Sequence, residues 1–86
     1  MNLLNMIFGY KRNKEYWIPI NDVKISYEFQ LSSPNSKKFR YKENVFRNSG
    51  CIGRIILDEN FELIDGYCSY LICKKYGMDK VPVWFI

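Results

Sequence analysis

Residues 55–83, IILDENFELIDGYCSYLICKKYGMDKVPV, hold the pattern that decides the fold of this 86-residue chain. The run over residues 54–58 is rich in isoleucine, which predicts a central strand because β-branched side chains suit a buried sheet. Glu59 and Asn60 predict a turn, with Asn60 in the left-handed region. Residues 61–64 then return as a second strand, so the stretch begins with a predicted β-hairpin.

A strand–turn–helix junction follows the hairpin at Asp65 and Gly66. We expect Asp65 to cap a helix over residues 67–76 and Gly66 to let the backbone turn sharply. Lysines lie in the last turn of that helix, where cations suit the helix dipole. Residues 81–86 predict a final strand, in which Pro82 indicates an edge position or a strand start.

The residues before the hairpin begin with another predicted strand. Residues 16–26 place Val23 and Ile25 in alternation with polar residues, which is the period of a half-buried strand. Pro19 interrupts the hydrogen-bonding ladder, so this segment is predicted to be an edge strand or two short pieces.

A loop and a helix are predicted next. Residues 27–35 are rich in turn formers and predict a loop. The helix is expected over residues 37–48, with Asn35 or Ser36 as its N-cap. Gly50 is the expected left-handed residue that ends it.

The composition is that of one small folded domain with a modest core. The apolar fraction of 48% and the aromatic fraction of 17% exclude a disordered chain. The net charge of +4 permits contact with nucleic acid or an acidic protein without demanding it. The chain has no histidine and only three cysteines, none in a CxxC pair, so we expect no metal, no cofactor and a reduced, cytoplasmic protein.

The first ten residues include an apolar run. Their run is too short to span a bilayer and lacks the features of a signal peptide, so we expect no membrane association. Two interpretations stay open: an element that packs on the core, or an arm that contacts a protein partner or a dimer mate. We therefore divide the chain into an arm and basic linker over residues 1–15 and a domain over residues 16–86. The arm residues expected at an interface are Leu3, Leu4, Ile7 and Phe8.

Taken in order, these elements resemble the ParB/sulfiredoxin-like superfamily, in the form of a stand-alone ParB-like N-terminal domain with a degenerate site. The resemblance covers about residues 17–86 and implies an α+β fold with a small mixed sheet of about four strands and two main helices. The matching segments are residues 18–20, Val23, Pro34 with Lys37 or Lys38, residues 55–57, residues 63–66, residues 74–77 and residues 81–83.

The Gly66 turn is the predicted anion site, because a helix N-terminus offers unpaired N–H groups, here those of Tyr67 and Cys68, to a negative ligand. The resemblance implies that this turn faces a nucleotide phosphate, a DNA-related ligand or a sulfinic acid. The chain departs from the family here, since Ser69 stands where an arginine would clamp phosphate. No histidine is present to act as a general base.

These departures lead us to predict no catalytic residues. An enzyme would have to use Asp65, Cys68 or lysines without their usual partners. Cys68 is either reactive at the helix start or a buried structural residue, and Cys73 is expected in the core. Asp58 and Asp65 are either Mg²⁺ ligands or turn formers.

Basic residues cluster over the first helix and the residues that follow it, with Glu43 as their acidic neighbour and aromatic residues between them. Such a surface either follows a phosphate backbone and stacks a base, or is the solvated face of an amphipathic helix. The basic residues are Lys37, Lys38, Arg40, Lys42, Arg47 and Arg54.

Two functions are therefore expected ahead of a third, a nucleotide-dependent enzyme. The first is a non-catalytic ParB-like module that binds DNA or RNA through the basic helix and the turn at Gly66 and Tyr67. The alternative is a protein-interaction module, such as a phage- or mobile-element-encoded inhibitor of a host or defence nuclease. It would bind its partner, or form a dimer, through the apolar arm together with Trp84 and Phe85.

Overall fold

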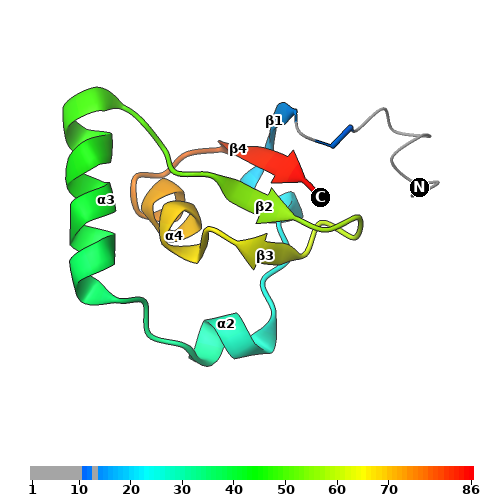
Figure 1. The fold of residues 1–86 in the computed structure, drawn as a ribbon, viewed down its shortest axis with the longest axis horizontal. Coiled ribbons are helices and arrows are strands. Elements are labelled where there is room, and N and C mark those ends of the chain that lie inside the picture. Colours follow the sequence, from blue (N-terminus) through cyan, green and yellow to red (C-terminus); the bar gives the residue numbers. More distant parts are fainter. Residues whose placement is uncertain (1–10, 13) are drawn as a thin grey trace.

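The computed structural model describes residues 11–12 and 14–86, which form a four-stranded sheet with helices beside it (Figure 1). The predicted α+β fold, with a small mixed sheet and two main helices, is confirmed. The elements in chain order are β1 (Glu15–Pro19), the 3₁₀ helix η1 (Ile20–Asp22), α2 (Tyr27–Leu31), α3 (Ser36–Ser49), β2 (Ile55–Leu57), β3 (Leu63–Asp65), α4 (Tyr67–Lys75) and β4 (Lys80–Phe85).

The strands lie in the order β1-β4-β2-β3. β4 pairs with β1 in antiparallel and with β2 in parallel orientation, and β2 and β3 form the predicted antiparallel hairpin. Pro19 ends the edge strand β1, as predicted. Of the two positions predicted from Pro82, the edge is wrong because β4 is central, and the strand start is close to the observed position, since Pro82 follows Lys80 and Val81 in β4. The parallel ladder with β2 begins only at Val83, so Pro82 lies in the part of β4 that pairs with β1 alone.

The core lies between the sheet and α4. Every strand contributes a buried side chain to it, and α4 contributes Tyr70 and Cys73 to the same cluster. The apolar run over β2 is buried because β2 is a central strand. The strand residues in the core are Ile18, Ile55, Leu57, Leu63, Val81, Val83 and Phe85.

The predicted strand does not continue beyond Pro19. Residues 20–22 form η1, and Lys24 makes only an isolated bridge with Glu62. Lys24 N–H donates to Phe61 O at 2.9 Å, and Leu63 N–H donates to Lys24 O at 2.8 Å. Lys24 is the single residue that pairs beside β3, and its neighbour Val23 is buried. The alternation of apolar and polar residues at Val23 and Ile25 therefore reflects burial, although this segment is not a strand.

The loop predicted over residues 27–35 is wrong in its first half, which forms α2. Ser26 is the N-cap of this helix, and its Oγ accepts a hydrogen bond from Phe29 N–H at 3.3 Å. None of the residues of α2 is fully buried, although Phe29 packs against the core.

α3 extends one residue beyond its prediction at each end and stands at the side of the domain (Figure 1). Asn35 is its N-cap, with Oδ1 accepting from Lys38 N–H at 3.0 Å, and Gly50 ends it with a φ of 75°. None of its side chains is fully buried. Its contacts with the domain come from one face, where the ring centroid of Phe46 lies 5.0 Å from that of Tyr76.

The turn between β2 and β3 is held by Asp58, whose Oδ1 accepts from Asn60 N–H at 2.8 Å and from Glu62 N–H at 2.9 Å. The left-handed residue is Phe61, with a φ of 66°, so the prediction for Asn60 is wrong. The ring of Phe61 packs on Phe85 at 5.2 Å between centroids, which explains why an aromatic residue occupies this position. No helix among the described residues is long and apolar enough to cross a bilayer.

Candidate functional site

α4 begins at Gly66 without a side-chain cap. Gly66 is the N-cap residue, with a φ of 94°, and no side chain accepts a hydrogen bond from the first turn. The cap predicted from Asp65 is wrong, because Asp65 Oδ1 accepts instead from Gly66 N–H at 2.8 Å. The first N–H groups of a helix have no partner within it, so this end of α4 favours a negative ligand.

Position 66 needs a glycine for two reasons, its positive φ and the lack of space for a side chain. A Cβ atom at this position would lie 2.3 Å from Arg54 O and 2.9 Å from Ile55 Cα. α4 therefore starts directly against the backbone that enters β2, which fixes the position of its N-terminus relative to the sheet.

A pocket of about 230 Å³ opens in front of this turn, and we call it the turn pocket. It brings together four of the residues predicted from the sequence: Lys38, Lys42, Gly66 and Tyr67. The lysines are one helical turn apart on α3, so both amines reach the same side of that helix. Asp65 also lines the pocket, where its Oδ1 accepts from Gly66 N–H and its one negative charge stands against the two lysines.

α2 and the loop after it form the opposite wall of the turn pocket. The ring of Tyr67 packs against Phe29 of α2, with 5.3 Å between centroids, and stacks on Tyr70 at 6.3 Å. Tyr67 is thereby held at the pocket by two aromatic contacts. The sequence did not indicate α2 as part of the site, although Ser26, a preferred N-cap residue, could have revealed the helix.

A second hollow, of about 420 Å³, lies on the other side of the same lysines, and we call it the aromatic pocket. Lys38 and Lys42 line both pockets. The other residues that line the aromatic pocket are Tyr41, Val45, Cys51, Ile52 and Gly53.

Ser69 lies beneath the edge of this surface. It is fully buried, and its Oγ has no hydrogen-bond partner among the described residues. A Cβ atom on Gly53 would lie 2.5 Å from Ser69 Oγ and 3.2 Å from Lys42 Nζ. The absence of a side chain at Gly53 therefore leaves room for the Ser69 hydroxyl and for the end of the Lys42 side chain.

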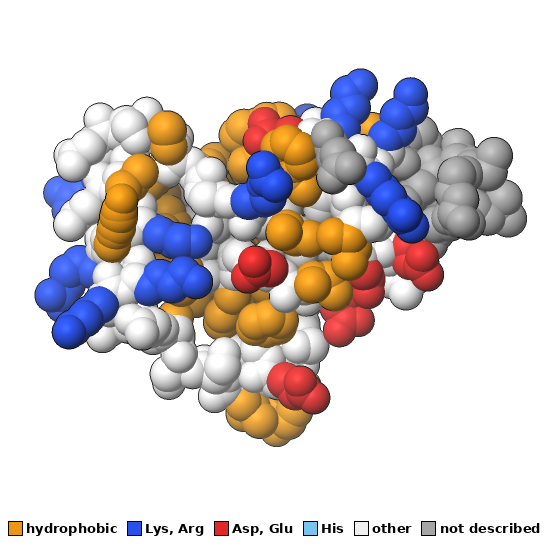
Figure 2. Space-filling model, viewed as in Figure 1, with side chains coloured by type: hydrophobic (Ala, Val, Ile, Leu, Met, Phe, Trp, Pro, Cys, Tyr) orange, Lys and Arg blue, Asp and Glu red, His pale blue; other side chains and the backbone are white. Residues whose placement is uncertain are grey.

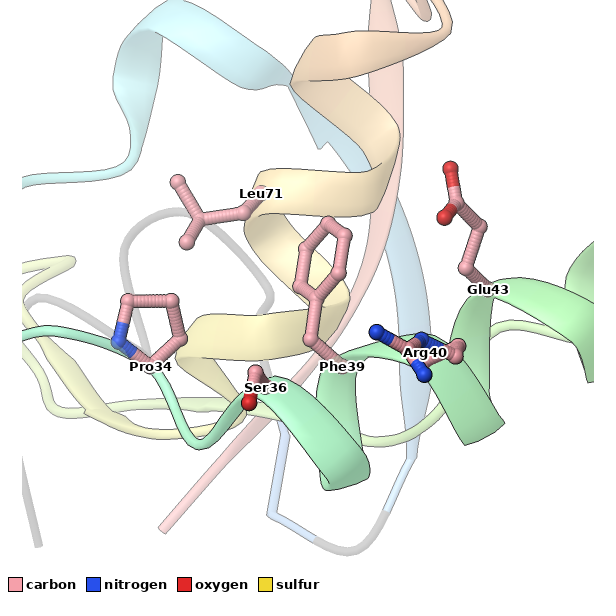
Figure 3. A pocket seen from close by; sticks show the side chains of 6 residues that line it. All are labelled: Pro34, Ser36, Phe39, Arg40, Glu43 and Leu71. Carbon is pink, nitrogen blue, oxygen red and sulfur yellow. The ribbon is translucent and has the colours of Figure 1, made fainter.

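The other predicted cations do not line the turn pocket. Arg40 lines a separate hollow of about 460 Å³ between α3 and α4, into which Phe39 and Leu71 point from the two helices (Figure 3). The guanidinium of Arg54 lies over the Trp84 ring, 4.3 Å from its centroid. Lys37 and Arg47 are exposed on α3.

The two pocket lysines of α3, Lys38 and Lys42, are not paired with the acid on the same helix. Glu43 accepts a hydrogen bond from Tyr76 Oη at 2.8 Å and forms an ion pair with Lys75. The hydrogen bond from Lys75 is the main cause that lowers the pKa of Glu43, and the pKa of Lys75 is raised by the same bond. Figure 2 shows Lys and Arg side chains over α3, at the left, without acidic side chains among them, while further Lys and Arg side chains at the centre and upper right lie near acidic ones.

The apolar residues predicted at a partner interface divide into three groups. Leu3, Leu4, Ile7 and Phe8 lie outside the described residues. Trp84 is half-buried under Arg54. The prediction for Phe85 is wrong, because Phe85 is 1% exposed and its ring packs against Phe61 and Tyr16.

Two of the cysteines and acids with alternative interpretations, Cys68 and Asp65, line the turn pocket. Cys68 and Cys73 are buried, and burial raises the pKa of Cys73 to about 11. Asp58 and Asp65 accept backbone hydrogen bonds in their turns. Across residues 11–12 and 14–86, no three His, Cys, Asp or Glu side chains come together in a way that could hold a metal ion.

The same architecture occurs in solved structures of ParB N-domains. The Pnob8-like ParB-N domain superposes with a TM-score of 0.70 at 30% sequence identity, over 84% of this chain and 29% of that chain. A second structure of the pNOB8-like ParB N-domain gives a TM-score of 0.64 at 28% identity, over 85% of this chain and 28% of that one.

The chain has a ParB-like fold. A C-terminally truncated ParB from Caulobacter crescentus, in complex with CTP-γ-S, shares it with a TM-score of 0.64 at 12% identity, over 86% of this chain and 44% of that chain. This ParB-like domain thus spans less than half the length of each of these structures. The fold predicted from the Gly66 turn and the segments around it is confirmed.

In sequence, this ParB-like chain is 31% identical over 64 residues to the uncharacterized protein ORF326b of Acidianus two-tailed virus. That match covers 74% of this chain and 20% of the viral protein. No protein-family model matches the chain.

Proposed function

We propose that this ParB-like domain is a binding module that holds the phosphate backbone of nucleic acid, DNA in the first place, in the turn pocket. The observation that carries the proposal is the convergence of Lys38 and Lys42 on the uncapped N-terminus of α4. Two lysines and a positive dipole end then line one cavity, and each of these favours an anion such as a phosphate group.

The charge of the chain supports this proposal. Since Glu43 is held by Lys75 and Tyr76 of the neighbouring segment, the lysines on the pocket side of α3 keep their charge for a ligand. The net charge of +4 would attract a polyanion over longer distances. The Caulobacter ParB structure holds CTP-γ-S, so a protein of the same fold binds a ligand that carries phosphates.

Fluorescence anisotropy with labelled single- and double-stranded DNA and RNA tests the proposal at salt concentrations of about 50 and about 200 mM. We expect binding that weakens steeply with salt, because each phosphate contact releases a counterion. Lys38→Gln and Lys42→Gln should each reduce the slope of log K against log salt by about 0.7 to 0.9.

Lys74→Gln is the matched control. Lys74 is exposed in the last turn of α4, at the opposite end of that helix from the turn pocket, and its loss changes the net charge equally. Equal losses of affinity for Lys38→Gln and Lys74→Gln would show that charge alone drives binding. Absence of binding at the lower salt concentration would contradict the proposal.

A protein partner is the second candidate, and α2 favours it. Tyr27 and Leu31 are 73% and 68% exposed and lie one helical turn apart, so they form an apolar face in water. The viral relative agrees with the expectation of a protein from a virus or mobile element. Under this function, Tyr27→Glu and Leu31→Glu would abolish a complex that Lys38→Gln leaves intact.

A further inference from the structure

The aromatic pocket shares a wall with the turn pocket. Lys38 and Lys42 stand between the two hollows and line both. A ligand whose phosphate lies in the turn pocket would therefore have its neighbouring group within reach of the aromatic pocket. The aromatic pocket is larger, at about 420 Å³ against about 230 Å³.

The side chains of the aromatic pocket are unlike those of the turn pocket. Tyr41 and Val45 lie one turn apart on α3 and are 62% and 37% exposed, and Ile52 faces them from the segment that leads into β2. An exposed aromatic ring beside lysines is the arrangement by which proteins hold unpaired bases, because every base offers a flat face for stacking.

A base in a duplex is stacked between its neighbours and cannot enter a side pocket without leaving the helix. A single strand presents its bases freely, and its backbone carries the negative charge that the lysines attract. The combination of a cationic wall and an apolar hollow thus complements a single strand better than a duplex.

We propose that the aromatic pocket holds an unpaired base of a single-stranded nucleic acid, with the ring of Tyr41 stacked on it and with Val45 and Ile52 as its apolar floor. This inference rests on the proposed function, since the adjacent phosphate occupies the turn pocket. It adds that single strands are the preferred ligand.

Cys51 provides a direct probe, because it lines the aromatic pocket and is exposed, whereas Cys68 and Cys73 are buried. The experiment measures the rate at which a thiol reagent modifies Cys51 with and without an oligonucleotide, alongside the affinity by anisotropy. The probes are an oligothymidylate of about 12 nucleotides, an abasic oligomer of equal length and a duplex of equal length.

We expect the oligothymidylate to slow the modification of Cys51 and to bind at least about five-fold more tightly than the abasic oligomer, since stacking of a base contributes on this scale. Tyr41→Ala should remove both effects and leave binding of the abasic oligomer unchanged. Tyr41→Phe should retain both effects. Tyr27→Ala, which removes an exposed tyrosine away from both pockets, is the matched control.

The outcomes that would overturn each proposal are distinct. Equal, salt-dependent binding of oligothymidylate and abasic oligomer would overturn the base pocket and leave the proposed function intact. Absence of binding by every oligomer would overturn the proposed function itself. Protection of Cys51 by thymidine monophosphate at the same concentration as by the oligothymidylate would identify a free nucleotide as the ligand and overturn the assignment to a single strand.

Discussion

Glu43 and Tyr76 are joined by a hydrogen bond of 2.8 Å from the tyrosine hydroxyl to Glu43 Oε2, although 33 positions separate them in the chain. The same oxygen pairs with Lys75. Because α3 has no fully buried side chain, this polar cluster and the adjacent ring contact of Phe46 with Tyr76 fix the helix that carries both pocket lysines.

Removing the carboxylate of Glu43 should therefore destabilise the domain in a pH-dependent way. The pKa of Glu43 is lowered in the folded protein, chiefly by the hydrogen bond from Lys75. The stability that the Glu43 carboxylate contributes is thus fully present above the ordinary carboxyl pKa of 4.5. This stability is lost as the pH falls through the lowered pKa of Glu43 in the folded protein.

The measurement is Tm against pH for the native chain and for Glu43→Gln. We expect Glu43→Gln to have the lower Tm at pH 7, and the two curves to converge in acid, where the native carboxylate is protonated. Glu59→Gln, an exposed change in the turn between β2 and β3, is the control and should leave Tm unchanged. A difference that persists unchanged into acid would refute the role of the ion pair.

Gly66→Ala should be among the most harmful single substitutions in the described part of the chain. It places a Cβ 2.3 Å from Arg54 O at a φ of 94°, so backbone strain and a clash with the entry to β2 add together. We expect a loss of about 2 to 5 kcal/mol in the free energy of unfolding, measured in urea.

Gly50→Ala separates the two causes. Gly50 has a similar φ of 75°, but a Cβ atom at this position would meet no atom within 4 Å, so only the strain of the left-handed backbone applies. We expect a loss of about 1 kcal/mol for this variant. Equal losses of stability at the two positions would show that the clash with Arg54 O adds nothing to the cost of Gly66→Ala.

Ser69→Ala should stabilise the domain. The Oγ of Ser69 is buried without a partner among the described residues, and an unsatisfied hydroxyl costs about 1 to 3 kcal/mol. Because alanine also favours a helix, we expect a gain of about 1 kcal/mol in the free energy of unfolding. Ser49→Ala, which removes a hydroxyl bonded to Val45 O at 2.7 Å, should bring no such gain. If Ser69→Ala instead lowered the stability, the Ser69 hydroxyl would have to make a hydrogen bond, and the prediction would be wrong.

The three cysteines should react at very different rates. Cys51 is exposed, whereas Cys73 is 0% exposed and has its pKa raised to about 11 by burial, which leaves almost no thiolate at neutral pH. Titration with a disulfide reagent at pH 8 should modify one thiol rapidly in the folded protein and all three after denaturation. Cys51→Ser should remove the rapid phase, and a rapid phase that survives this change would contradict the burial of the other two.

The sequence predicted the fold best where local chemistry decides the structure. Asn35 and Gly50 bracket α3 because a cap and a left-handed residue act on their immediate neighbours. α2 was missed because five residues cannot form a stable helix alone, and the packing of Phe29 onto the core and onto Tyr67 adds to the local cap at Ser26. The central position of Pro82 follows from the register of three strands, which no local pattern contains.

The candidate site was predicted in its components but not in its arrangement. Nothing in the sequence favoured any one of the six basic residues as a ligand contact. In the structure, only Lys38 and Lys42 of these six line the pocket at the Gly66 turn. Their selection depends on how α3 is rotated against α4, which is set by contacts of Glu43 and Phe46 with residues about thirty positions away. Ile52 and Gly53, which complete the aromatic pocket, belong to a connecting segment without a pattern of its own.

The central place of β4 also determines when the domain can fold. β1 is made early and pairs only with β4, and β2 depends on β4 for one of its two neighbours. A nascent chain therefore cannot assemble its sheet until residues 80–85 have left the ribosome. Until then, β1 has no strand to pair with. Since this pairing closes a loop of most of the domain, we expect slow folding for so short a chain, and exposure to chaperones and proteases for as long as the sheet is incomplete.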